Sequence, residues 1–231
     1  MKNLYLLLNI GTILIPFLAS FHPRLKFYKK WKSLLISIIL TNLVFIPWDV
    51  YFTKISVWGF NSNYYFGYSI FGLPVEELLF FICIPYACVF MHYSLLELYP
   101  KFTFTRVIGK RITVLILSTF FLMLLFNYDK WYPLINYSIA IVLLFFVYFN
   151  NKILLYRYYK TFIVMLIPFF IVNGVLTGTG IVDEVVWYNN FENMGIRLFT
   201  IPVEDITYAF TLILSNLYIV DYFHQKKSIN S

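Results

Sequence analysis

Two pairs of adjacent carboxyl side chains open two of the long apolar stretches in this sequence. Each pair occurs in the pattern Pro-Val-Glu-acid, and the two copies, 128 residues apart, comprise Glu76 and Glu77 after Pro74, and Glu204 and Asp205 after Pro202. Membrane segments seldom contain ionisable groups, so a repeated acidic pair at such a position is a candidate functional site. Neighbouring carboxyls at an apolar boundary suit acid–base chemistry, in which one group donates a proton and its partner later removes one.

The residues that follow each pair indicate which carboxyl faces the site. Glu204 shares a helical face with the polar residues of an otherwise apolar stretch, which are Thr207, Tyr208, Thr211 and Ser215. We therefore expect Glu76 and Glu204 to be the principal catalytic acids, with Glu77 and Asp205 as their modulators. Pro74 and Pro202 suit the first position of a helix, which would place the acids in its first turn, where the helix dipole favours negative charge.

A further acid, Asp49, follows Trp48 at the end of another apolar stretch. It could complete a substrate-binding site, although an interfacial Trp-Asp pair at a helix end is equally well explained as structural. The expected substrate-binding residues are Asp49, Trp48, Pro74, Pro202 and Tyr208.

The composition is that of a polytopic membrane protein. Of the 231 residues, 61% are hydrophobic, 22% are aromatic and only 13% are charged, which is too few charges for a soluble domain of this size. We expect an all-α fold with seven transmembrane helices. Their approximate ranges are 4–20, 33–50, 75–97, 112–128, 133–150, 161–178 and 202–222.

Basic residues concentrate in alternate loops, which predicts the orientation of the chain in a cell membrane. One side contains Arg24, Lys26, Lys29, Lys30, Lys32, Lys101, Arg106, Lys110, Arg111, Lys152, Arg157, Lys160, Lys226 and Lys227, and the other contains only Lys2, Lys54, Lys130 and Arg197. The positive-inside rule then places the N-terminus outside and the C-terminus in the cytoplasm, with both acidic pairs near the outer leaflet.

The repeated motif predicts an internal duplication. Residues 1–100 would form a first three-span repeat, residues 101–130 a linking fourth span, and residues 131–231 a second three-span repeat that runs parallel to the first. Each repeat has a long aromatic loop before its acidic helix, at 51–73 and 179–201. These loops could form lids over a cavity, or their aromatic residues could simply lie at the membrane interface.

Several functional classes are not favoured by the sequence. The basic residues lie in short loops between apolar stretches, which argues against nucleic acid as a partner. The three histidines have no metal-site spacing, so we expect no metal. Gly178-Thr179-Gly180 lacks the third glycine of a dinucleotide fingerprint, so no flavin or nicotinamide cofactor is evident. The seventh stretch, 202–222, has no lysine for a retinal Schiff base.

The doubled signal, Phe71-Gly72-Leu73-Pro74-Val75-Glu76-Glu77 and Ile201-Pro202-Val203-Glu204-Asp205, resembles the non-flavin lycopene cyclases of bacteria and fungi. This chain is similar to the fused, two-unit form of that family over nearly its full length. It departs from the family pattern where Asp205 replaces the second Glu of a pair. The second repeat also has no acid at the position that matches Asp49.

The resemblance implies an isomerase of the intramolecular lyase type, which closes β-rings on the ends of lycopene with no net redox change. A carboxylic acid protonates the terminal double bond, the neighbouring alkene attacks the cation, and loss of a proton completes the ring. The expected partners are lycopene or a related linear carotenoid, membrane lipid, and other enzymes of the carotenoid pathway. An ε-ring, or a ring on a longer carotenoid, would need the same first step. A transporter with parallel repeats, or a non-catalytic interaction protein, is the alternative.

Overall fold

The structure, a computed structural model, describes residues 2–229. Met1, Asn230 and Ser231, of which the last two end the expected second repeat, lie outside the described residues. Within residues 2–229 most of the chain forms seven α-helices, which confirms the expected all-α class. The helices are α1 (Leu4–Ala19), α2 (Trp31–Lys54), α3 (Val75–Leu98), α4 (Arg106–Phe126), α5 (Trp131–Asn150), α6 (Lys152–Leu176) and α7 (Val203–Ile229).

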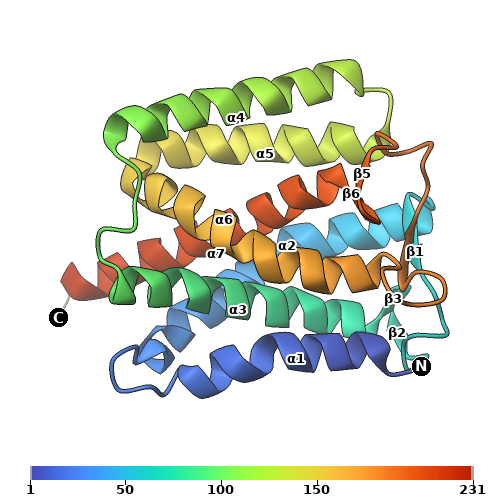
Figure 1. The fold of residues 1–231 in the computed structure, drawn as a ribbon, viewed down its shortest axis with the longest axis horizontal. Helices are drawn as coiled ribbons and strands as arrows, with labels where there is room; N and C mark the ends of the chain where they lie inside the picture. Colours follow the sequence, from blue (N-terminus) through green and yellow to red (C-terminus); the bar gives the residue numbers. More distant parts are fainter. Residues whose placement is uncertain (1, 230–231) are drawn as a thin grey trace.

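Six of these helices, α2 to α7, are long and apolar enough to cross a membrane. The first helix, α1, is also apolar but has 16 residues, which corresponds to a length of about 24 Å. It lies alongside α3 for most of its length (Figure 1). The helices therefore form one bundle of apolar elements that matches the expected multi-pass membrane protein.

Successive helices run in opposite directions along the bundle (Figure 1). As a result α1 and α5 start at the same end, and so do α3 and α7. This is the arrangement of two three-helix units that run parallel, with α4 as the link between them. The described chain starts at one end of the bundle and finishes at the other.

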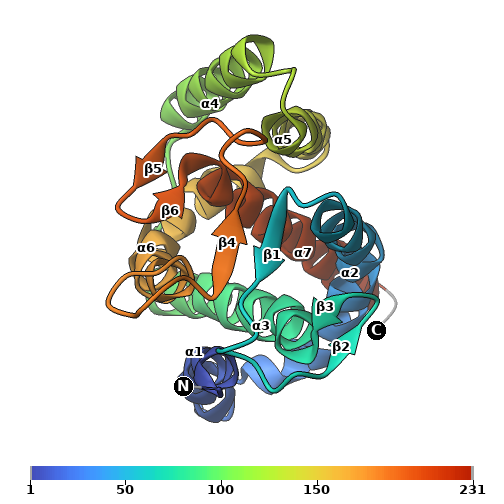
Figure 2. The same cartoon turned by 90° about the vertical axis from the view of Figure 1, so that its right-hand side faces the viewer.

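Short strands gather at the end of the bundle where α3 and α7 begin, which we call the strand end (Figures 1 and 2). They are β1 (Trp58–Phe60), β2 (Ser69–Ile70), β3 (Leu73–Pro74), β4 (Val186–Tyr188), β5 (Arg197–Leu198) and β6 (Ile201–Pro202). The pairs β2–β3 and β5–β6 are tight antiparallel hairpins that lead directly into α3 and α7. Phe71 and Gly72 form the turn of the first hairpin with positive φ angles of 55° and 88°, as a two-residue hairpin turn requires.

The central contact at the strand end is the antiparallel pair β1–β4 (Figure 2). In this pair Trp58 lies opposite Tyr188, Gly59 opposite Trp187, and Phe60 opposite Val186. Residues of β4 follow their counterparts in β1 by 128 positions, the spacing of the acidic motifs. A pseudo-twofold axis therefore passes between Gly59 and Trp187, and it relates one helical unit to the other.

Helix packing follows the same pseudo-symmetry. In the first unit α1 packs on α3, and in the second α5 packs on α7. Across the units α2 packs on α7, and α3 packs on α6. The linking helix α4 lies at the periphery against α5 (Figure 2). The acidic helices α3 and α7 therefore occupy the centre of the bundle, and this position determines where their first turns lie.

The expected position of the two prolines is wrong by one residue. Pro74 has φ −55° and ψ 145°, an extended conformation, and it is the N-cap of α3, which begins at Val75. Pro202 likewise belongs to β6, and α7 begins at Val203. The reason is that both prolines are paired in the hairpins, where their neighbours across the strand are Ser69 and Arg197. The acidic residues still lie in the first turn of each helix.

Gly59 offers a test of the β1–β4 contact. A Cβ atom at this position would lie 2.3 Å from Cζ2 of Trp187, so Gly59→Ala forces the indole ring away from the strand pair. We expect the free energy of unfolding to fall by about 1–3 kcal/mol. Thermal unfolding of the purified protein in detergent measures this change.

The matched control is Gly11→Ala in α1, because a Cβ atom at Gly11 has no neighbouring atom within 4 Å. Alanine also favours a helix over glycine, so this variant should be as stable as the parent or slightly more stable. Equal unfolding temperatures for the Gly59 and Gly11 variants would show that the close approach of Trp187 is unimportant.

Candidate active site

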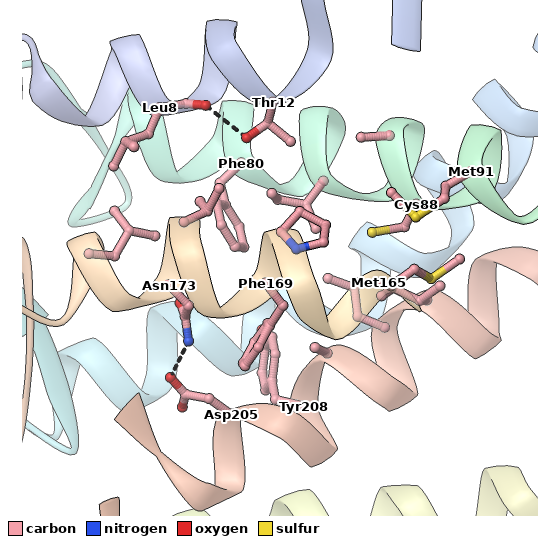
Figure 3. Close-up of a pocket in the computed structure, with 18 of the residues that line it drawn as sticks. Leu8, Thr12, Phe80, Cys88, Met91, Met165, Phe169, Asn173, Asp205 and Tyr208 are labelled. Carbon is pink, nitrogen blue, oxygen red and sulfur yellow. Dashed lines mark hydrogen bonds between the residues drawn. The ribbon is translucent and has the colours of Figure 1, made fainter. Parts of the chain in front are cut away.

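A cavity of about 600 Å³ lies between α1, α3, α6 and α7, and β1 and β4 contribute to its wall (Figure 3). Most of its lining side chains are aliphatic or aromatic. On α3 the lining residues extend from Glu77 to Leu98, which corresponds to roughly 30 Å along the helix. The cavity is therefore a long apolar slot whose length is similar to the thickness of the hydrocarbon core of a bilayer.

Three carboxyl side chains line this slot, and each comes from a different helix: Asp49 from α2, Glu77 from α3 and Asp205 from α7. All three are buried, with exposed fractions of 2%, 8% and 5%. Because α3 and α7 begin at the strand end, Glu77 and Asp205 both lie there. The slot thus has a carboxyl-bearing end, which we call the acid end, and a longer apolar part.

Asp205 accepts three hydrogen bonds from side chains of three other elements. Tyr132 donates to Oδ1 at 2.7 Å, Asn173 donates to Oδ2 at 2.8 Å, and Tyr188 donates to Oδ2 at 2.9 Å. Figure 3 shows the bond between Asn173 and Asp205 across the slot. Hydrogen bonds of this number and length stabilise a negatively charged carboxylate.

Tyr188 belongs to β4, outside the helical spans, and remains a hydrogen-bond donor at neutral pH. Burial raises the pKa of its phenol well above the ordinary value, and the nearby Asp205 carboxylate raises it further. The phenol therefore keeps its proton and donates it in the hydrogen bond to Asp205.

The other two carboxyls have fewer partners. Glu77 Oε2 accepts a hydrogen bond from Tyr5 of α1. Asp49 Oδ1 accepts one from the indole N–H of Trp58 at 2.6 Å, while Asp49 Oδ2 is buried and has no partner among the described residues. Among the described residues, the acid end thus contains one carboxyl with three side-chain donors and two carboxyls with a single side-chain donor each.

Glu76 and Glu204 are buried but do not line the slot. Glu76 Oε1 accepts from the backbone N–H of Phe66 at 2.8 Å, and Glu204 Oε1 accepts from that of Met194 at 2.5 Å. Each glutamate therefore connects the start of its helix to the loop ten residues earlier. Within each pair it is Glu77 and Asp205 that line the slot, whereas Glu76 and Glu204 were expected to face the site.

This placement of the acids has a physical cause. The polar stripe of α7 was expected to follow the site, but Thr207 and Thr211 are buried and do not line the slot. Thr211 Oγ1 donates to the carbonyl of Thr207 at 2.7 Å, so its hydroxyl is satisfied within the helix. The slot is apolar, and α7 lines it with the largely apolar face that follows Asp205 along the helix and includes Tyr208 and Leu212.

A second repeated motif, which was not among the expected site residues, holds the acids in place. Tyr5 and Asn9 of α1 match Tyr132 and Asn136 of α5, 127 residues apart and each spaced i, i+4 on one helical face. Each tyrosine donates to the second acid of a pair, and each asparagine donates to the backbone carbonyl of the first acid at 2.8 Å. The repeated Tyr-x-x-x-Asn was the available signal, whereas Asn173 had none.

The expected substrate-binding residues separate into two groups. Asp49 and Tyr208 line the slot, whereas Trp48, Pro74 and Pro202 do not. Trp48 packs behind Tyr208 with ring centroids 4.8 Å apart. The aromatic loops also reach the site, because Trp58 and Phe60 of one loop and Tyr188 of the other line the slot.

This arrangement supports proton transfer to and from an apolar molecule. A long apolar substrate can lie in the slot with one end among the three carboxyls. The rings of Trp58, Tyr132 and Tyr208 form the wall there, and their faces can stabilise a developing cation. Within residues 2–229 no group of three or more His, Cys, Asp and Glu side chains is arranged to hold a metal ion.

Asn173 offers a test of the hydrogen bonds around Asp205. Asn173→Ala removes one of two donors to Oδ2 and leaves a buried carboxylate less satisfied. We expect the free energy of unfolding to fall by about 1.5–3 kcal/mol, the usual contribution of a hydrogen bond to a charged group. The control is Asn150→Ala, because Asn150 is exposed and donates only to a carbonyl of its own helix; its effect should stay below about 0.5 kcal/mol. Equal losses in thermal unfolding would contradict the importance of this donor.

Comparisons with known proteins agree with the duplicated fold. A family model described as lycopene cyclase matches the chain twice, at residues 2–96 and 129–223. Its two matches contain both acidic pairs and both Tyr-x-x-x-Asn motifs. No solved structure matches the chain significantly.

Two curated fungal proteins are similar over short stretches. The bifunctional lycopene cyclase/phytoene synthase of Aspergillus oryzae is 31% identical over 52 residues, which cover 22% of this chain and 9% of that protein. The protein of the same description from Podospora anserina is 33% identical over 45 residues, which cover 20% of this chain and 8% of that protein. The match thus spans less than a tenth of the length of either relative.

Proposed function

The chain belongs to the lycopene cyclase family, and on this basis we propose that it is an integral-membrane enzyme that closes β-rings on the ends of lycopene. The observation that carries the proposal is the long apolar slot with Asp49, Glu77 and Asp205 at one end. A linear hydrocarbon fits a slot of this length and polarity, and only its terminal part would meet the carboxyls. The reaction would be an isomerisation, because no atom is gained or lost.

We assign Glu77 as the acid. Its carboxyl meets one donor, Tyr5, whereas Asp205 meets three, and an apolar wall disfavours a charged group that has few partners. Glu77 would transfer its proton to the terminal double bond of the substrate. The neighbouring alkene then attacks the resulting cation and closes the six-membered ring, which moves the positive charge onto a ring carbon.

We assign Asp205 as the carboxylate that opposes this cation and removes a ring proton. Its three donors hold it in place before the reaction, so no reorganisation is needed as the charge develops. Loss of the proton to Asp205 restores the neutral hydrocarbon. A proton passed from Asp205 back to Glu77 resets the site. Since one proton is added and one removed, these steps need no redox cofactor.

The remaining site residues would support this chemistry. Asp49 lies at the acid end and adds a third carboxyl that can stabilise the cation. Tyr208, backed by Trp48, presents an aromatic ring to the same region. Pro74 and Pro202 end the hairpins that set the first turns of α3 and α7, so they position the acids and do not touch the substrate.

Substitution of the four acids tests these roles. We expect Glu77→Gln and Asp205→Asn to reduce ring formation by at least about 100-fold, because each removes an acid–base group. Glu76→Gln and Glu204→Gln keep an oxygen that can accept the loop N–H, so they should lose less than about tenfold. The measurement is carotenoid analysis in a lycopene-accumulating bacterium, with the amount of each variant in the membrane determined in parallel.

The outcomes separate the assignment from the function. Full activity of both Glu77→Gln and Asp205→Asn would overturn the catalytic roles. If the parent chain itself leaves lycopene unchanged although it is present in the membrane, the cyclase proposal is wrong, and a transporter or a non-catalytic interaction protein becomes the better explanation.

We also propose that the strand end faces the outside of the cell membrane and that the C-terminus is cytoplasmic. The connections at the opposite end of the bundle contain the excess of lysine and arginine, as the positive-inside rule requires of cytoplasmic loops. The acid end of the slot would then lie near the outer leaflet.

Two single cysteines test this orientation in a variant without Cys83 and Cys88. Asn63→Cys lies in the exposed loop after β1, and Lys101→Cys lies in the exposed loop after α3. A membrane-impermeant maleimide added to intact cells should label the first variant and label the second only after the cells are broken. The reverse pattern would place the strand end in the cytoplasm.

A further inference from the structure

The part of the slot farthest from the carboxyls contains an unsatisfied hydroxyl group. The residues that line this part include Met91, Leu95 and Leu98 of α3, which are apolar, and Ser94 between them. Ser94 Oγ is buried and has no hydrogen-bond partner among the described residues. A buried hydroxyl without a partner costs free energy, so its presence in a hydrocarbon-binding slot needs a reason.

Ser94 also lines a second cavity of about 260 Å³ at the end of the bundle opposite the strand end. The wall of this cavity is more polar, because it includes Lys30, Glu97 and Arg157. Tyr93 lines it too, and its hydroxyl is again buried without a partner in the part of the chain that the structure describes. Two unsatisfied hydroxyls from consecutive residues therefore lie where the apolar slot and the polar cavity meet.

The polarity of the slot changes in order along its length. Carboxyls occupy the acid end, apolar side chains line the middle, and the hydroxyl of Ser94 follows at the far end, next to the second cavity that Tyr93 lines. A substrate that is a pure hydrocarbon leaves both hydroxyls unpaired. A substrate with a hydroxyl group on its far terminus can pair with Ser94 in the slot, and with Tyr93 where that terminus extends into the second cavity.

We propose that the far end of the slot binds the hydroxylated terminus of a linear carotenoid while the opposite, unmodified terminus lies at the acid end. This inference rests on the proposed function and narrows its substrate class to linear carotenoids that bear a terminal hydroxyl group. The product is a carotenoid with one ring and one hydroxylated acyclic end. Ser94 and Tyr93 act in recognition, since they lie far from the carboxyls and do not touch the reacting carbons.

The test compares two substrates with the purified full-length protein in lipid nanodiscs. One substrate is lycopene, and the other is a linear carotenoid of the same chain length with a tertiary hydroxyl on one terminus. One hydrogen bond contributes about 1 kcal/mol, so kcat/KM for the hydroxylated substrate should exceed that for lycopene by about fivefold. The difference should lie mainly in KM, because the contact is equal in the ground and transition states.

The substitution Ser94→Ala should lower the ratio of the two kcat/KM values about fivefold, toward one. Ser94→Thr is the matched control, because it keeps the hydroxyl and should keep the preference. Tyr93→Phe removes only the second hydroxyl and provides an independent measurement if Ser94→Ala does not fold.

Three results would decide the matter. A parent protein that shows no preference for the hydroxylated substrate overturns the proposal, and so does a preference that both Ser94→Ala and Tyr93→Phe leave unchanged. If neither substrate is cyclised, the proposed function fails separately. Quenching of tryptophan fluorescence by the two carotenoids then still tests whether Ser94 favours binding of the hydroxylated one.

Discussion

The architecture depends on the satisfaction of buried carboxyl groups in a bundle that is otherwise apolar. Four acids lie in the first turns of α3 and α7, and all are buried. A buried carboxylate without partners is costly, and each of the four carboxyls accepts a hydrogen bond from another part of the chain, although Oε2 of Glu76 and Oε2 of Glu204 have no partner among the described residues. Tyr5 of α1 donates to the carboxyl of Glu77, and Tyr132 of α5 donates to that of Asp205, while Asn9 and Asn136 donate to the backbone carbonyls of Glu76 and Glu204.

This requirement explains why the strand end is ordered. Glu76 and Glu204 hold the loops through the backbone N–H groups of Phe66 and Met194, and these loops also provide β1 and β4. With the loops held, Trp58 and Tyr188 reach Asp49 and Asp205. The first acid of each pair therefore supports the structure and leaves its neighbour free to face the slot.

The two units share the same helical arrangement but differ in the side chains that surround the second acid of each pair. Asn173 and Tyr188 bond to Asp205, whereas the positions 128 residues earlier are Phe45 and Phe60, which have no hydrogen-bonding groups in their side chains. Duplication thus provides two carboxyls at one end of one slot. Divergence of their neighbours makes one of them a stabilised carboxylate and leaves the other with a single donor. A proton donor and a proton acceptor are the two roles that an acid–base reaction requires.

The sequence by itself determined the helices of the bundle and their direction. The length of the apolar stretches, the prolines near their ends and the repeated acidic motif are local or regularly spaced features, so they can be identified without the tertiary structure. It also identified Glu77 and Asp205 as the second acid of each pair. Only the tertiary structure decided which acid of each pair lines the slot. That choice depends on the rotation of α3 and α7 against α1, α5 and α6, and on donors such as Asn173 that no motif marks. The polar stripe behind Glu204 had predicted that Glu204 faces the site. A slot for an apolar molecule is instead lined by apolar side chains, so the buried threonines of that stripe lie away from it. The hydroxyl of Thr211 is satisfied within its own helix.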